Sequence, residues 1–314
     1  MGHRSDRARI CSATRCLVRR FLPYLAASFT GIQVGAALVA SEAVVETTGA
    51  AGLGFWRYLI ASIVLVPFWI ASRKPCIGRG DLLPISIIGS GQFGLLIAML
   101  NVAVLLASSA RVSFVFAALP LATLAFERMI FHMRISKAET LAILLSLLGI
   151  AVLLGTDLYA SATGPFEVLG LLAALVATLT GAVCSVYLRP YVRRYGGVQV
   201  SLLAMLASLV PLGAFAALES QGLSTGGSTY ATVLLVVGIG LSSGAGFWCW
   251  LYALSHIPAG HVTAFLGLSP ITAALLSVAF NNESTTASVI AALGLVVAAL
   301  LVLVFAKGTK STGN

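Results

Sequence analysis

Long apolar runs separated by short polar segments fill almost the whole chain. Each run is continuous rather than alternating, and about 20 residues is the length that a helix needs to cross about 30 Å of hydrocarbon. Helices and closed barrels are the two structures that can span a bilayer, and continuous runs favour helices. We therefore expect an all-α membrane protein with ten transmembrane helices. Their approximate ranges are 21–41, 51–71, 82–106, 109–131, 138–155, 166–188, 198–218, 230–254, 261–280 and 287–306.

The second half of this pattern repeats the first. The stretch from Asn101 to Gly155 returns near residue 251, with an offset of 150 residues. Pairs at this offset include Ala103 with Ala253, Ala110 with Gly260, Ser113 with Thr263, Pro120 with Pro270, and Thr30 with Thr180. Pro67 also matches Pro211, at an offset of 144, and Gly91 matches Gly240. A unit of five spans crosses the membrane an odd number of times, so its two copies have opposite orientations. The predicted fold is therefore two inverted five-helix repeats.

Positive charge marks one side of the predicted membrane. Lys and Arg lie before the first span and in every second loop, whereas the loops at 42–50, 156–165, 219–229 and 281–286 contain none. Because cytoplasmic loops are enriched in Lys and Arg, we expect a multi-pass protein of the plasma or inner membrane with both termini in the cytoplasm. The expected parts are a basic segment at 1–20, a first repeat at 21–155, a second repeat at 166–306 and a tail at 307–314.

Composition supports a membrane protein and limits its partners. The chain is 59% hydrophobic and only 9% charged, against about 25% charged residues in soluble domains. The net charge is +9, but the Lys and Arg residues lie in alternate loops. A basic patch for nucleic acid would not follow this alternation, so we expect no nucleic-acid partner. The five cysteines, His256 and His261 form no metal-binding pattern, and no metal or cofactor is expected. The N-terminus also resembles a secretory signal ending at Ala40-Ser41, but its apolar run is long for a signal and cleavage would break the repeat.

Arg57 is the polar residue with the sharpest implication. It lies about seven residues into the second span, on the order of 10 Å along a helix. A cation at that depth is costly unless it faces a cavity or a partner. One interpretation is that Arg57 faces a central cavity and holds a substrate carboxylate or phosphate. The other is that it pairs with Glu42, Glu46 or a carbonyl, or that its side chain reaches the membrane surface. Reaching the membrane surface is also one interpretation of Arg111.

Several other polar and aromatic residues lie inside the predicted spans. A buried polar group needs a hydrogen-bond partner, so helix–helix bonding is one interpretation of each, and a shared polar cavity is the other. The candidate substrate-binding residues are Arg57, Arg111, Gln33, Asn101, Ser113, Tyr187, Trp248, Tyr252 and Thr263. Trp248 and Tyr252 also fit an aromatic belt at the membrane interface. We find no Ser/His/Asp or Cys/His arrangement, so no catalytic residue is expected.

Two further motifs are expected to serve packing. The segment Gly89–Gly94 reads GxGxxG, but it lies inside a membrane run without a flanking strand. Glycines there allow helices to approach closely, and the pairs Gly31/Gly35 and Gly240/Gly244 are interpreted in the same way. Glu127 and Arg128, near the inner end of the fourth span, predict an ion pair or an interfacial anchor.

The two halves resemble the drug/metabolite transporter superfamily, and within it the EamA-type permeases. The resemblance covers about residues 21–306. It rests on ASSARVSFVFAALPLATLAFERM with LAILLSLLGIAVLL, on IPAGHVTAFLGLSPITAALLSVAFNNE with its following helix, and on FWRYLIAS in the second span. The resemblance implies a secondary transporter that works by alternating access, with a central site that spans one, three, four, six, eight and nine could line.

The expected function is a non-enzymatic permease for a small solute. Arg57 favours an anionic or zwitterionic solute, and the resemblance implies an amino acid or a related metabolite, exported rather than imported. The alternatives are a transporter of sugars or nucleotide-sugars, a transporter of hydrophobic drugs, and a membrane-embedded enzyme acting on a lipid. Proton or exchange coupling and the oligomeric state are left open by the sequence.

Overall fold

The computed structural model describes residues 3–72, 74–132, 165–219, 229–256 and 265–281, and short pieces within 136–149 and 290–302. Side chains are described from residue 21 onward. Seven helices of this part are long and apolar enough to cross a membrane, and Phe265–Phe280 forms a shorter apolar helix. Eight of the predicted spans thus coincide with helices. The predicted spans at 138–155 and 287–306 fall mostly outside the described residues.

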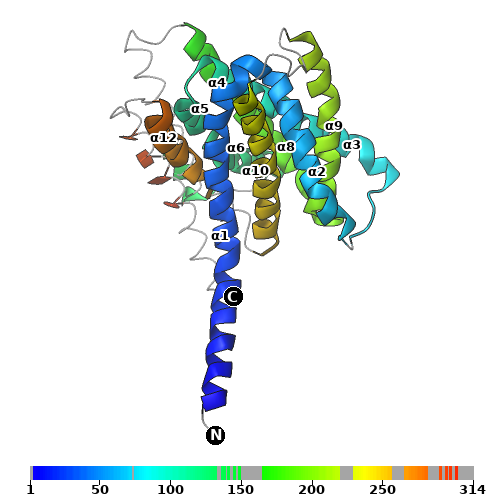
Figure 1. The fold of residues 1–314 in the computed structure, drawn as a ribbon, viewed down its shortest axis with the longest axis vertical. Coiled ribbons are helices and arrows are strands. Elements are labelled where there is room, and N and C mark those ends of the chain that lie inside the picture. The colour runs from blue at the N-terminus through cyan, green and yellow to red at the C-terminus, as the bar shows by residue number, and fades with distance from the viewer. Residues whose placement is uncertain are drawn as a thin grey trace.

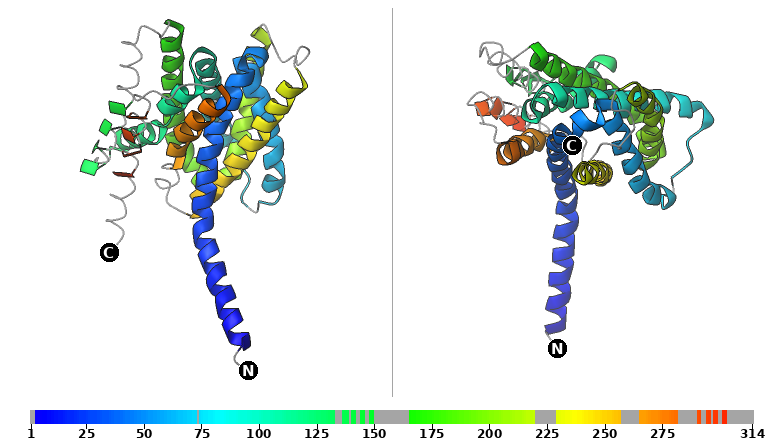
Figure 2. Two further views of the ribbon diagram at one scale, coloured as in Figure 1. Left: turned by 60° about the vertical axis from the view of Figure 1, so that its left-hand side comes forward. Right: turned by 45° about the horizontal axis from the view of Figure 1, so that its top comes forward.

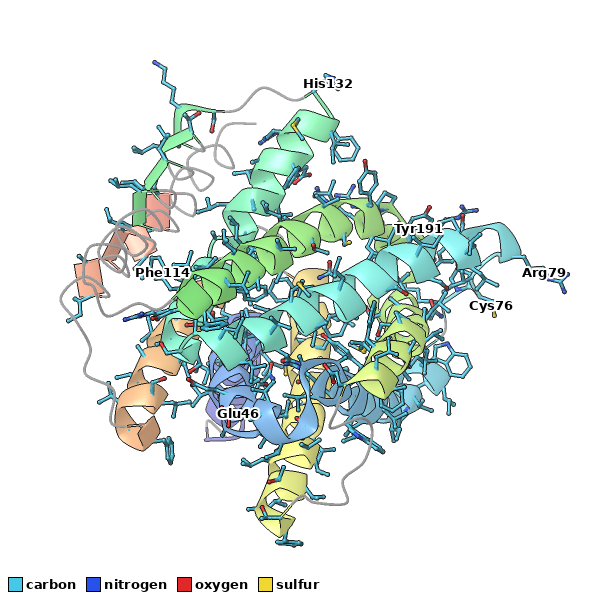
Figure 3. The ribbon with its side chains drawn as sticks, turned by 90° about the horizontal axis from the view of Figure 1, so that it is seen from above. Glu46, Cys76, Arg79, Phe114, His132 and Tyr191 are labelled. Atoms are coloured by element: carbon cyan, nitrogen blue, oxygen red, sulfur yellow. The ribbon has the colours of Figure 1, made fainter. Side chains whose placement is uncertain are left out.

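The described elements are helical. They are α1 (His3–Thr48), α2 (Ala50–Ile70), α3 (Arg79–Gly89), the π-helix η1 (Ser90–Leu95), α4 (Leu96–Leu106), α5 (Ser109–Phe116), α6 (Leu119–Ile130), α8 (Pro165–Tyr195), α9 (Gly197–Leu218), α10 (Tyr230–His256), the 3₁₀ helix η2 (Phe265–Gly267) and α12 (Leu268–Asn281). The N-terminal part of α1 projects beyond the other helices (Figures 1 and 2). Phe114 of α5 lies inside the bundle, whereas Cys76 and Arg79 lie at its edge (Figure 3).

Proline breaks the fourth span of the first repeat into two helices. α5 ends at Phe116, and α6 begins at Leu119 with Pro120 in its first turn. Proline is tolerated there because the first amides of a helix have no intrahelical partner. In the second repeat, Pro270 likewise lies in the first turn of α12, directly after η2. The two matched prolines therefore occupy the same structural position.

The helices form a closed ring, and its order is α2, α10, α1, α12, α5/α6, α8, α3/α4 and α9, which returns to α2. The packing between neighbouring helices of the ring is symmetric under exchange of the two halves. α1 packs against α10 as α8 packs against α4, while α2 with α9 and α5 with α12 are pairs that map onto themselves. This is the arrangement that two inverted repeats produce around a pseudo-two-fold axis.

Side-chain contacts define the two faces of the ring. The first, the Gly49 side, gathers the ends of α1, α4 and α9 with the starts of α2, α5 and α8. It is held by an Asn101 Nδ2 bond to the Ala50 carbonyl (2.8 Å) and by the Arg111–Glu167 ion pair. The opposite face, the Gly196 side, is held by the Arg189–Glu127 ion pair, so of the two interpretations of Glu127 the structure shows the ion pair.

The N-termini of α2 and α9 have oppositely charged neighbours at the two faces. Gly49 (φ +72°) and Gly196 (φ +91°) precede α2 and α9, at matching positions of the two repeats, in a backbone conformation that favours glycine. The Glu219 carboxylate accepts hydrogen bonds from the Ala51 and Gly52 amides at 2.8 and 3.1 Å. This negative charge suits the positive end of the α2 dipole. At Gly196 the matching neighbour is Lys74.

Glycine contacts reveal one residue that breaks the repeat. Gly89 and Gly94 face Ala204 and Ser208 of α9, and Gly240 and Gly244 face Ile60 and Val64 of α2. The partners are four residues apart in both pairs, and so are Gly240 and Gly244, but Gly89 and Gly94 are five apart. The π turn at Ser90–Leu95 accommodates the extra residue. The structural counterpart of Gly240 is therefore Gly89, not Gly91 as the sequence match suggested.

Packing across the ring differs between the two faces. On the Gly49 side, α1 crosses to α4 and α5, and α2 crosses to α4. The counterparts of α1·α4 and α2·α4 on the Gly196 side are α8·α10 and α9·α10. Among the described residues, the first of these has no comparable packing and the second is slight. Within the described helices, the ring is therefore drawn together on the Gly49 side.

Candidate functional site

Arg57 is a buried residue in the first half of α2. Its side chain is buried, with 9% of the residue exposed, and its Nε has no hydrogen-bond partner. The contact recorded for its guanidinium is the Tyr58 ring, 5.9 Å away. Among the described residues it has no ion pair, so neither Glu42 nor Glu46 neutralises it. The structure thus contains a buried cation without a counter-ion in the described part of the chain.

Three aromatic rings cross the ring of helices beside Arg57. Tyr58 of α2 meets Phe93 of η1 edge-on at 5.2 Å, and Phe93 meets Phe247 of α10 edge-on at 5.5 Å. These separations fall in the favourable range for edge-to-face pairs. The first two rings come from the first repeat and the third from the second, so this triad joins the two repeats.

Gln33 and Gln92 mark two matching polar contacts between the repeats. Gln33 Nε2 of α1 lies 3.4 and 3.5 Å from the hydroxyls of Ser242 and Ser243 on α10, so both bonds are long. Ser185 of α8 donates to Gln92 Oε1 of η1 at 3.3 Å. The pseudo-two-fold exchanges these two helix pairs, so each interface carries one glutamine and one or two serines with their roles reversed.

Three predicted site residues have structural partners on the Gly49 side. Arg111 pairs with Glu167 of the other repeat, and Asn101, 1% exposed, is bonded to the Ala50 carbonyl. The buried Ser113 hydroxyl donates to the Ala110 carbonyl in its own helix at 2.7 Å. These contacts agree with the helix-bonding interpretation, and they separate the three residues from Arg57.

In the described part of the chain, no hydrogen bond or ring contact joins Tyr187, Trp248 or Tyr252 to Arg57. Tyr187 is half-exposed on α8. Trp248 stacks with Tyr252 at 5.8 Å, and the row of rings continues to Phe68 on one side and His256 on the other. This row follows the Gly196-side end of α10, as expected for an interfacial aromatic belt. Thr263 lies outside the described residues.

The sequence interpretation missed Tyr58, Phe93, Phe247 and Glu219. Aromatic residues in an apolar run carry no periodic signal that separates a contact between repeats from lipid-facing packing. Glu219 lies in a loop that lacks Lys and Arg, and only its spatial proximity to Gly49 gives it a role. Glu219 and Gly52 are 167 residues apart in the chain, so their contact cannot be inferred without the α2–α9 pairing. In the part of the chain that the structure describes, no group of three or more His, Cys, Asp or Glu side chains could hold a metal ion.

Comparisons with known proteins identify the family of this architecture. A solved structure described only as "Crystal structure of protein" aligns with a TM-score of 0.63 at 20% identity, over 89% of this chain and 96% of that one. This likeness concerns the fold alone. No match was found among the curated proteins. The model of the EamA-like transporter family matches residues 21–155 and again residues 168–305. The chain therefore belongs to the EamA-like transporter family.

Proposed function

We propose that the protein is a secondary carrier that moves a small carboxylate-bearing solute, an amino acid or a related metabolite, across the cytoplasmic membrane by alternating access. Membership of a transporter family supplies the class of activity. The observation that carries the solute class is Arg57, a buried cation whose counter-charge the described residues do not provide. A guanidinium binds a carboxylate through paired, charge-assisted hydrogen bonds.

The surroundings of Arg57 support a solute that also has an apolar part. The Tyr58 ring lies 5.9 Å from the guanidinium, and the edge-on contacts of Phe93 and Phe247 extend this aromatic surface to α10. Gln33 of α1 contributes an amide with two long hydrogen bonds to α10. An amide that is weakly bonded to the protein can exchange its partners for a polar group of the solute at small cost. A charged anchor, an aromatic surface and an amide together suit an amino acid better than a hydrophobic drug.

The proposed orientation follows from the charges of the loops. The Gly49 side carries Glu42, Glu46, Glu167 and Glu219, whereas Lys74, Arg79, Arg189, Arg193 and Arg194 lie toward the Gly196 side. By the enrichment of Lys and Arg in cytoplasmic loops, the Gly196 side faces the cytoplasm and both termini lie there. Export rather than import follows from the resemblance to metabolite permeases, in which the solute would enter from the Gly196 side.

A transporter of sugars or nucleotide-sugars is the second candidate. A phosphate group would occupy the same guanidinium as a carboxylate. A membrane-embedded lipid enzyme has less support, since Glu167, Glu127 and Asp81 serve in ion pairs and Glu219 caps a helix.

Metabolite profiles of cells that overexpress or lack the protein would first select solutes, and transport would then be measured in proteoliposomes. We expect Arg57→Met to lower transport of the selected solute by about 10- to 100-fold, because a lost charge-assisted hydrogen bond costs about 1.5–3 kcal/mol. Arg57→Lys keeps the charge and should retain part of the activity.

Arg194→Gln is the matched control. Arg194 already pairs with Asp81 on the exposed Gly196 side, so its loss should leave transport near the parent value. Unchanged transport in Arg57→Met would refute the carboxylate anchor. A comparable loss in Arg194→Gln would mean that removing any positive charge lowers transport, without a specific role for Arg57.

A further inference from the structure

Arg57 differs from the other arginines whose partners the structure gives. Arg111 pairs with Glu167, Arg189 with Glu127, and Arg194 with Asp81. Arg57 is more deeply buried than these three, yet its Nε is unbonded and no described carboxylate pairs with it. Burying an unpaired charge is strongly unfavourable, whereas the same charge in contact with water or an anion is not.

The burial of Arg57 depends on the closure of the Gly49 side. One turn closer to that side, Gly54 of α2 faces Ile97 of α4 and Leu212 of α9. Beyond it, Asn101 of α4 bonds to the first carbonyl of α2, and Ser109 of α5 contacts Ser277 of α12 across 3.2 Å. These contacts close the ring between Arg57 and the Gly49 side. Separation of α2 from α4 there would open a path for water to the guanidinium.

The two observations together assign a condition to the closure. We propose that the Gly49 side closes over Arg57 only when an anion accompanies the guanidinium, so that the unloaded carrier rests with that side open and Arg57 hydrated. The inference builds on the proposed function and adds its coupling: a carboxylate is required for the change of state as well as for binding. A solute without a negative group would leave the closed state with an unpaired buried cation, and the carrier would not transport it.

The distribution of packing supports this assignment. The cross-ring contacts of α1 and α2 with α4 occur on the Gly49 side, while the described counterparts on the Gly196 side have little packing. The structure thus shows the closed state, which the proposal allows only with a bound anion. In this state the Arg57 charge has no counter-ion among the described residues. The condition is a shift of population, set by how much better the anion binds the closed state than the open one.

Thiol accessibility measures closure without knowledge of the natural solute. The five native cysteines are replaced, and Ser109→Cys places a thiol that closure buries against Ser277. Its rate of modification by a charged thiol reagent is compared in the parent, Arg57→Met, Arg57→Gln and Arg57→Lys backgrounds, without and with L-alanine or L-alaninamide. The amide has the same side chain as alanine but lacks the carboxylate. Monodispersity and thermal unfolding show which variants are folded, and Arg57→Gln replaces Arg57→Met if the latter is not.

Without an added solute, the neutral variants should react about tenfold or more slowly than the parent, because their closed state no longer buries a charge. Arg57→Lys should react like the parent. L-alanine should slow the parent and leave the neutral variants unchanged, whereas L-alaninamide should slow neither. Equal rates in the parent and both neutral variants would overturn the proposal, as would equal protection by the amide. Loss of transport in Arg57→Met with equal accessibility would keep the proposed function and reject the coupling alone.

Discussion

At the scale of single residues, position in the pseudo-symmetric fold decides what a polar side chain does. Arg57 and Arg111 looked alike in the sequence, as cations of the outer half of the bundle. The structure gives Arg111 a carboxylate from the other repeat and gives Arg57 none among the described residues. The difference could not be predicted, because Glu167, in the first turn of α8, is 56 residues from Arg111 in the chain.

Glu219 provides a test of the helix cap. Glu219→Ala removes two hydrogen bonds to the α2 amides and a charge at the favourable end of the helix dipole. We expect the free energy of unfolding to fall by about 1–2 kcal/mol, measured by thermal unfolding in detergent. Glu46→Ala is the control, since Glu46 is an exposed carboxylate on the same side. An equal loss in both variants would contradict a specific cap.

At the scale of elements, most helices follow directly from the pattern of apolar residues, and their irregularities do not. The predicted spans at 51–71, 109–131 and 198–218 match α2, α5 with α6, and α9 within two residues at each end. The π turn carries no signal in hydrophobicity, because one inserted residue leaves an apolar run apolar. It became visible only when the glycine contacts fixed the register of both repeats.

Deletion of single residues tests the π turn. Removal of Gly91 should convert Ser90–Leu95 to an α-helix and bring Gly89 and Gly94 to the four-residue spacing of Gly240 and Gly244. The contacts with Ala204 and Ser208 would persist, so expression and thermal stability should stay near those of the parent. The Gln92–Ser185 bond should be lost.

Removal of Leu241, which is exposed on α10, is the matched deletion. It would leave three residues of spacing between Gly240 and Gly244 and rotate the rest of α10 by about 100°. We expect this variant to express poorly or to be much less stable. If both deletions were equally harmful, or equally harmless, the extra residue would not be confined to the π turn.

At the scale of the whole molecule, the sequence repeat predicted the architecture, and the structure adds that the ring is closed on the Gly49 side. An odd number of spans in each copy requires inversion, and the paired contacts around the ring agree with it. Closure on one side could not be predicted, since both states of a carrier share one sequence and differ in how the same surfaces pack.

A disulfide between the repeats would test that state. Ser109 and Ser277 are buried, with their hydroxyls 3.2 Å apart, so cysteines at both positions should cross-link under mild oxidation. The bond would hold the Gly49 side closed and stop transport, and reduction should restore it. Each single cysteine variant controls for the substitutions themselves. Transport that continued in the fully cross-linked carrier would show that α5 and α12 need not separate on this side.

The extra residue of the π turn also bears on the history of the chain. An internal duplication creates two copies that are initially interchangeable, and each can later diverge. An insertion within a regular α-helix would rotate all following residues about the helix axis. A π turn accommodates the extra residue within a single turn of the helix. The third span could therefore acquire a residue without disturbing its contacts with α9. The two copies are therefore not equivalent at the π turn, where Gln92 and Phe93 meet the opposite repeat.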